Sequence, residues 1–310
     1  MEKILITGAL GQLGTDLLEG LIQRYGPEHI IATDLKPANR DLGVVFEELD
    51  VLDGDQLGQV INRHKVNQIY HLAAILSARA ENNPLMAWDI NMTGLFNVLE
   101  AARIFDLQKL FWPSSIAMFG PDTPKDQTPQ KTIANPNTIY GIQKLAGERW
   151  CEYYHQRYGL DIRSVRYPGL IGYKSMAGGG TTDYAVDIYF NAARGQDFTC
   201  FLKEDTQLPM LYMKDAVRAT IELMESDPSK ISIRSSYNLA GLSFTPLEIY
   251  QEIIKTKPDF NISYEPDFRQ KIADSWPNSI DDSVARADWG WKAEFNLSEM
   301  TRDMFDHLSD

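Results

Sequence analysis

A tyrosine and a lysine stand four residues apart in the segment PNTIYGIQKLAGERW, residues 136–150. The segment has the pattern of a helix, and positions i and i+4 lie on one helix face, so Tyr140 and Lys144 are expected to be neighbours. A free phenol has a pKa of about 10, and a nearby cation favours its ionised form. The pair could therefore supply a base that works near neutral pH. The alternative is that both side chains lie on a solvated helix surface.

Three glycines follow the first apolar segment. The stretch LITGALGQLG places Gly8, Gly11 and Gly14 between an expected strand and an expected helix. Glycines at this position permit a tight turn and let a pyrophosphate approach the positive end of the helix. Asp34 ends the next strand, where a carboxylate can accept hydrogen bonds from the ribose of NAD and would repel the 2′-phosphate of NADP. The pattern predicts an NAD site, with a helix cap or turn as the alternative role for Asp34.

Short apolar segments alternate with helical patterns over the first half of the chain. Strands are expected at 3–7, 30–34, 45–50, 67–74, 109–115 and 161–167, and helices at 14–25, 56–64, about 84–104 and around Tyr140. This alternation is typical of βαβ units. It predicts an α/β fold with a Rossmann-type, doubly wound parallel sheet.

The pattern changes after Tyr167. Residues 168–184 are rich in glycine and are expected to form a loop, and the tail is expected to be irregular around three tryptophans. Helices are predicted at 184–195, 212–226 and 245–256, and a late strand at 236–241. We therefore expect an NAD-binding domain over 1–167 and a smaller α/β substrate-binding domain over most of 168–310, with 212–241 returning to the main sheet.

Charge and composition exclude several classes of protein. The chain of 310 residues carries 30 basic and 43 acidic side chains, a net charge of −13, which argues against nucleic acid or an anionic membrane as partner. No apolar run has the length of a membrane span, and MEKILITG enters a strand without room for a signal peptide. Cys151 and Cys200 form neither a disulfide framework nor a zinc spacing, and the histidines show no metal-ligand grouping. We expect a cytoplasmic protein without a metal.

With this glycine spacing and a Tyr-x-x-x-Lys pair, the chain resembles the extended short-chain dehydrogenase/reductase family. YHLAA, PSSIAMFG and TIYGIQK match that family's fourth-strand, serine and catalytic segments in order. The resemblance implies that Tyr140 takes the proton of a substrate hydroxyl, while Lys144 lowers the tyrosine pKa and binds the nicotinamide ribose. It further implies that Ser115 orients the substrate oxygen. Ser114 remains the alternative, because PSS offers two hydroxyls.

The resemblance also predicts the contacts with NAD. Asp50 and Val51, after the third strand, could bracket the adenine, and Asn91 falls where the family has a helix-kinking asparagine, although plain helix surface is its alternative. His71 could equally be a neutral core residue or a cofactor contact. The expected cofactor-binding residues are Gly8, Gly11, Gln12, Leu13, Gly14, Asp34, Leu35, Asp50, Val51, Leu72, Ala73, Ala74, Asn91, Tyr140, Lys144, Tyr167 and Leu170.

Two later segments are more specific. GGGTTDYA (178–185) and ADSWPNSIDDSVARADWGW (273–291) resemble the L-threonine 3-dehydrogenases of the short-chain type, although Met176-Ala177 stands where proline is expected. The resemblance implies NAD-dependent oxidation of the β-hydroxyl of L-threonine to 2-amino-3-oxobutanoate by a homodimer. The Gly178–Gly180 amides could donate to the substrate carboxylate. The expected substrate-binding residues are Ser77, Ser114, Ser115, Tyr140, Gly180, Thr181, Thr182 and Trp276.

Two other functions share these motifs. A nucleotide-sugar epimerase or dehydratase has the same loop and the same Tyr/Lys pair, but it needs a larger second domain with basic residues for a diphosphate. A non-catalytic NAD(H)-sensing protein could use the same fold. Such proteins often lose the tyrosine or the lysine, and both Tyr140 and Lys144 are present here.

Overall fold

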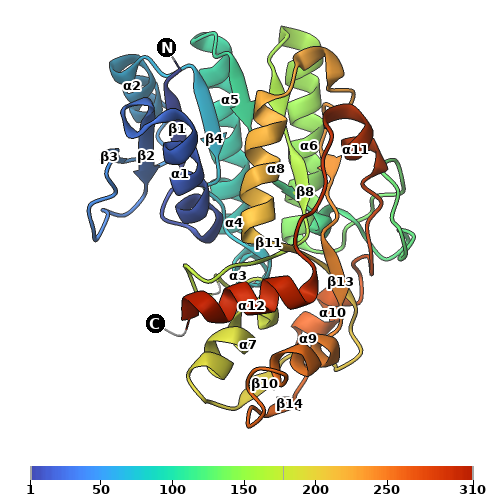
Figure 1. The fold of residues 1–310 in the computed structure, drawn as a ribbon. Helices are drawn as coiled ribbons and strands as arrows, with labels where there is room; N and C mark the ends of the chain where they lie inside the picture. The colour runs from blue at the N-terminus through green and yellow to red at the C-terminus, as the bar shows by residue number, and fades with distance from the viewer. Residues whose placement is uncertain (1, 177, 309–310) are drawn as a thin grey trace.

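A parallel sheet forms the centre of the larger unit in the computed structural model, which describes residues 2–176 and 178–308 (Figure 1). Its six strands all run in the same direction. Their order is β3 (Val45–Glu48), β2 (Ile30–Asp34), β1 (Ile4–Thr7), β4 (Gln68–His71), β5 (Lys109–Phe111) and β7 (Ile162–Arg163). The chain order reverses between β1 and β4, so a crevice opens there at the carboxyl ends of the strands. The predicted Rossmann-type α/β fold is confirmed.

Three further strands form a small sheet of their own. The expected strands 109–115 and 161–167 are each divided, and Pro113, which has no N–H for a sheet ladder, stands at the first interruption. The resulting three-stranded sheet has the order β12 (Tyr237–Asn238), β8 (Val165–Tyr167) and β6 (Ser114–Ser115), all parallel. The segment 212–241 contributes β12 and the helix α8 (Met213–Glu225) to the larger unit.

Helices cover both faces of the sheet. Ile4 and Ile6 belong to one core and Leu5 to the other, because alternate residues of a strand point to opposite faces. One core includes residues of α1 (Gln12–Tyr25), α8 and α11 (Ser283–Trp289), and the other includes residues of α2 (Gly54–His64), α5 (Gly94–Ile104) and α6 (Ile139–Tyr158). The helix expected at 84–104 consists of α4 (Pro84–Trp88), a π-helical turn (Asp89–Thr93) and α5. Within the described part of the chain, no helix is long and apolar enough to cross a membrane.

The smaller unit lies below the sheet in Figure 1. Its elements are β9 (Gly169–Ile171), α7 (Tyr184–Ala193), β10 (Phe198–Cys200), β11 (Leu208–Tyr212), β13 (Leu242–Phe244), α9 (Pro246–Ile253), β14 (Ile262–Tyr264), α10 (Arg269–Ala273) and α12 (Leu297–Leu308). The expectation of irregular segments around the tryptophans holds for Trp276 and Trp291 but not for Trp289, which ends α11. The tail also contains more helix than expected, because it includes α10, α11 and α12. The first two are shorter than ten residues, so they show no clear periodicity and depend on tertiary packing.

Candidate active site

A cleft of about 1030 Å³, including its open mouth, lies where the carboxyl ends of the strands face the smaller unit. It joins segments that lie far apart in the sequence. The predicted residues that line it are Gly8, Gly11, Gln12, Leu13, Gly14, Leu72, Ala74, Ser77, Ser114, Ser115, Tyr140, Lys144, Tyr167, Leu170, Gly180, Thr181, Thr182 and Trp276. The lining residues that sequence reasoning missed are Leu76, Pro113, Ile116, Pro168, Gly169 and Asp183. All six are direct sequence neighbours of predicted residues, which was the available signal.

The glycine loop forms one end of the cleft and has the shape that a pyrophosphate requires. Gly8 has φ +72°, and a Cβ on Gly14 would lie 2.3 Å from the Gly8 carbonyl oxygen. Side chains are therefore excluded at both positions, and the loop leads directly into the N-terminus of α1, whose amides favour an anion. The buried Gln12 Nε2, on the cleft wall, has no hydrogen-bond acceptor among the described residues. The loop thus fits the diphosphate of NAD.

Asp34 lies at the carboxyl end of β2, beside this loop but outside the cleft lining. Its Oδ2 accepts a hydrogen bond from the Leu10 amide at 2.9 Å. The bond fixes the carboxylate at the point where an adenosine ribose would lie if the diphosphate sits on the loop.

Replacing Asp34 with Ala is expected to narrow the preference for NAD over NADP. The substitution removes the charge that would repel a 2′-phosphate, so the ratio of kcat/KM values for the two coenzymes should fall. Steady-state kinetics with each coenzyme measures the ratio. Asp53→Ala is a matched control, because Asp53 caps α2 by accepting from the Gln56 amide at 2.8 Å. An unchanged ratio in Asp34→Ala would show that another residue sets the preference.

Tyr140 and Lys144 lie in the first turns of α6. The helix begins where the Thr138 hydroxyl accepts a hydrogen bond from the Gly141 amide at 3.1 Å, so both residues fall in its first two turns, beside the cleft. Lys144 Nζ lies 5.3 Å from the centroid of the Tyr140 ring and donates to the Pro113 carbonyl at 2.6 Å. The predicted neighbours therefore meet inside the cleft, where Tyr140 is 8% and Lys144 is 4% exposed, and not on a solvated surface.

Burial shifts the two groups in opposite directions. It raises the pKa of Tyr140, and a hydrogen bond with Ser115 partly offsets this rise. Burial also lowers the pKa of Lys144 to about 7. A charge on either group alone is disfavoured, whereas a phenolate and an ammonium formed together attract each other. The two side chains are thus expected to titrate as a pair.

The two serines of the PSS segment have different partners. Ser114 donates its hydroxyl hydrogen bond to Glu148 Oε1 at 2.6 Å, away from the tyrosine. Ser115 is hydrogen-bonded to Tyr140. Successive residues of an extended strand point in opposite directions, which explains why only one hydroxyl meets the tyrosine. Of the two alternatives, Ser115 has the geometry for orienting a substrate oxygen.

Small polar groups line the end of the cleft near the smaller unit. The Thr181 amide donates to Ser77 Oγ at 3.2 Å, and the two hydroxyls of these residues are also 3.2 Å apart. The Gly179 and Gly180 amides, expected to face a substrate carboxylate, instead donate to Asp183 Oδ2 at 2.7 and 2.6 Å. A carboxylate of the chain itself therefore occupies them. Ala177, which stands with Met176 where the family pattern has proline, lies outside the described residues.

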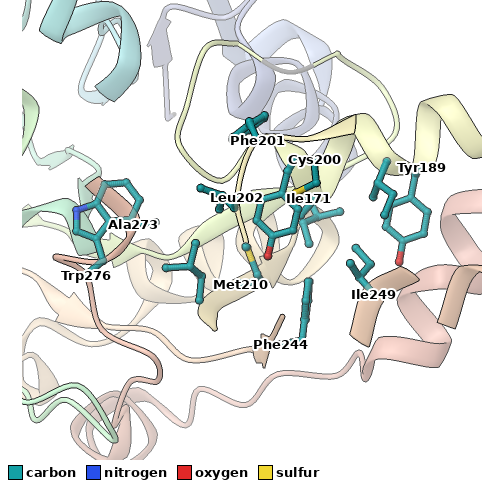
Figure 2. Packing of buried hydrophobic residues seen from close by; sticks show 14 of the residues in the cluster. Ile171, Tyr189, Cys200, Phe201, Leu202, Met210, Phe244, Ile249, Ala273 and Trp276 are labelled. Atoms are coloured by element: carbon teal, nitrogen blue, oxygen red, sulfur yellow. The ribbon is translucent and has the colours of Figure 1, made fainter. Parts of the chain in front are cut away.

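Trp276 closes this end of the cleft. Figure 2 shows it at the margin of the apolar cluster of the smaller unit, with its ring nitrogen in view. The residue is 5% exposed, and no described residue accepts a hydrogen bond from its Nε1. A buried N–H without a partner is costly, so this donor suits an acceptor on a bound molecule.

Like Asp34, five more of the predicted cofactor residues lie outside the cleft lining. They are Leu35, Asp50, Val51, Ala73 and Asn91. Asn91 lies in the π-helical turn and bonds Gln143 Oε1 at 2.7 Å and both backbone groups of Ile75, so it supports α6 from behind. His71 is a buried neutral residue whose pKa burial lowers to about 3, and its Nδ1 lies 2.8 Å from Thr7 Oγ1. Over residues 2–176 and 178–308, no His, Cys, Asp and Glu side chains are grouped to hold a metal.

The sheet order and the glycine loop at its switch point define a dinucleotide-binding protein of the Rossmann type. Residues 4–240 match the model of the NAD dependent epimerase/dehydratase family. The chain belongs to this family and is an oxidoreductase that uses NAD.

Solved structures and curated relatives cover nearly the whole chain. The GalE-like L-threonine dehydrogenase from Cupriavidus necator, in its holo form, is 57% identical over 99% of both chains with a TM-score of 0.97. The L-threonine dehydrogenase from Clostridium difficile is 46% identical over 100% of this chain and 98% of its own, with a TM-score of 0.96. An uncharacterized epimerase/dehydratase of Staphylococcus saprophyticus is 49% identical over 99% of this chain and 97% of its own.

Proposed function

We propose that the protein oxidises the β-hydroxyl of L-threonine with NAD to give 2-amino-3-oxobutanoate. The observation that carries this proposal is the cleft itself, in which a buried tyrosine–lysine pair stands between the dinucleotide loop and a small polar wall. The likeness to L-threonine dehydrogenases over the whole chain supports the same substrate.

Tyr140 is the proposed base. It takes the proton of the substrate hydroxyl, while Ser115 donates a hydrogen bond that holds the substrate oxygen against the phenol. Lys144 has two roles, because its ammonium favours the phenolate and can also donate to the ribose of a bound cofactor. NAD, when bound, supplies the acceptor for the hydride that leaves Cβ. The Pro113 carbonyl keeps the lysine amine in place at 2.6 Å.

The polar wall suits a small zwitterion. Trp276 Nε1 and the Thr182 hydroxyl can donate to the substrate carboxylate, and Asp183 places a carboxylate on the same wall that can attract the ammonium. Ser77 and Thr181, already bonded to each other, form the rigid side of the wall. Both charged ends of the amino acid therefore have partners, while the hydroxyl faces Tyr140.

An NAD-reduction assay with L-threonine, other alcohols and UDP-sugars tests the proposal. L-Threonine is expected to give NADH with saturation kinetics, and UDP-sugars are expected to remain unchanged. Efficient epimerisation of a UDP-sugar with inert L-threonine would reject the proposal in favour of a nucleotide-sugar epimerase. Tight NADH binding without turnover of any alcohol would favour a sensor.

A further inference from the structure

One face of α6 contacts residues 113–115, called the serine segment, at three successive turns. Tyr140 bonds Ser115, Lys144 donates to the Pro113 carbonyl at 2.6 Å, and Glu148 accepts from the Ser114 hydroxyl at 2.6 Å. The three helix residues are spaced i, i+4 and i+8, so they lie in one row. Tyr140 and Lys144 form the proposed catalytic pair, whereas Glu148 takes no part in the proposed proton transfer.

Glu148 is fully buried and is held by a buried arginine. Arg166 Nε donates to Glu148 Oε1 at 2.9 Å, and Arg166 Nη2 donates to Oε2 at 2.8 Å. Arg166 Nη1 donates to the Gln130 carbonyl at 3.0 Å and to Asn238 Oδ1 at 2.9 Å. A buried ion pair is tolerated only when hydrogen bonds compensate for its lost hydration, and this pair has them. The carboxylate is therefore fixed in position.

The register of the small sheet explains how this carboxylate reaches the site. Ser114 pairs with Arg166 and Arg166 pairs with Asn238, so the three residues form one row across β6, β8 and β12. Glu148 projects from α6 onto this row. Glu148 and Arg166 line a second cavity, whereas Ser114 lines the active-site cleft. The pair therefore supports the cleft from behind, through Ser114, without lining it.

Glu148 also supplies the negative charge beside Lys144. Burial lowers the pKa of Lys144 to about 7, and negative charge on Cys151 or Glu148 would oppose this lowering. The other groups facing the lysine amine carry no such charge: burial raises the pKa of the Cys151 thiol, His71 has a pKa of about 3, and the Trp112 ring lies 4.5 Å away.

We propose that Glu148, held by Arg166, is a positioning residue that fixes the serine segment against Tyr140 and Lys144. Through Ser114 it sets the place of the Ser115 hydroxyl and of the Pro113 carbonyl. Through its charge it favours the ammonium form of Lys144, and so the phenolate of Tyr140. The inference rests on the proposed roles of Tyr140 and Lys144 but not on the identity of the substrate.

The pH dependence of Glu148→Gln tests the electrostatic part. Without the charge, Lys144 holds its proton less well and Tyr140 ionises at higher pH. The acid-side midpoint of the kcat profile should therefore rise by about one pH unit. Glu148→Asp keeps the charge and should restore the midpoint even if kcat stays lower. Glu152→Gln is the matched control on the same helix, because Glu152 pairs with Arg149 at 2.7 Å, and it should leave the midpoint unchanged.

A readout without substrate separates this inference from the proposed function. Tyrosinate absorbance, taken as the difference between each protein and its Tyr140→Phe counterpart, reports the ionisation of Tyr140 alone. The same upward shift is expected in Glu148→Gln, whichever alcohol the enzyme oxidises. An unshifted midpoint in both measurements, or an equal shift in Glu152→Gln, would overturn the electrostatic part.

Ser114→Ala tests the mechanical link if Glu148→Gln fails to fold. The change removes one hydroxyl and leaves the ion pair intact, so kcat should fall roughly tenfold or more, because small displacements of reacting groups are costly. A wild-type kcat in Ser114→Ala would show that Glu148 does not act through the serine segment.

Discussion

Tyr140→Phe is expected to remove nearly all turnover while NAD still binds. The phenylalanine ring keeps the packing of a residue that is 8% exposed, and only the proton acceptor is lost. A general base typically contributes about 10²–10⁴-fold to the rate. Steady-state NAD reduction measures the loss in kcat, and a fluorescence titration measures the dissociation constant of NAD. A variant that keeps a large fraction of the wild-type rate would contradict the central assignment.

The pH profile of the same variant checks the reason for the loss. In the wild type, the rate should rise with pH as a proton leaves the Tyr140–Lys144 pair, since the base must be deprotonated. Burial raises the pKa of Tyr140 and lowers that of Lys144, so the rise reports the pair and not a free phenol. In Tyr140→Phe this rise should disappear. If the rise with pH persists in Tyr140→Phe, a group other than Tyr140 must lose the proton that limits the rate.

The second large effect is expected between two stereoisomers of the substrate. L-Threonine should be oxidised efficiently and L-allo-threonine should be slower by about 10²-fold or more. In the proposed orientation, the carboxylate and ammonium hold the molecule on the wall formed by Thr182, Asp183 and Trp276. With the hydroxyl facing Tyr140, the Cβ hydrogen then points at the nicotinamide in only one configuration of Cβ. Inversion exchanges the hydrogen and methyl directions, and lost alignment of this kind costs several kcal/mol. Comparison of kcat/KM for the two isomers measures the discrimination.

L-Serine is the control for this prediction, because it keeps both charged ends and the hydroxyl but lacks the methyl group. A missing methyl costs roughly 1–3 kcal/mol in an apolar pocket, so L-serine should be a poor substrate and not an inert one. Equal rates with L-threonine and L-allo-threonine would leave the reaction class intact. They would, however, refute the proposed orientation of the substrate.

The hydrogen-bond partners of individual hydroxyls and amides could not be predicted from local sequence. The PSS segment offered two equivalent hydroxyls, and only the pairing of β6 with β8 directs Ser114 to Glu148 and Ser115 to Tyr140. The amides of Gly179 and Gly180 are free donors in the sequence but are bonded to Asp183 in the fold. Each outcome depends on where a polar partner lies in space.

The sequence by itself determined the parts of this protein that depend on neighbours along the chain. The glycines follow a strand and precede a helix, and Tyr140 and Lys144 are one helical turn apart, so their residue types and spacing already specify a dinucleotide loop and a phenol beside a cation. Only the tertiary structure placed Asp183 on the cleft wall and joined Glu148, Arg166 and Asn238 into one buried network. Periodicity and spacing report contacts within a helix or strand, whereas burial and hydrogen-bond partners across the cleft arise only when distant segments pack together.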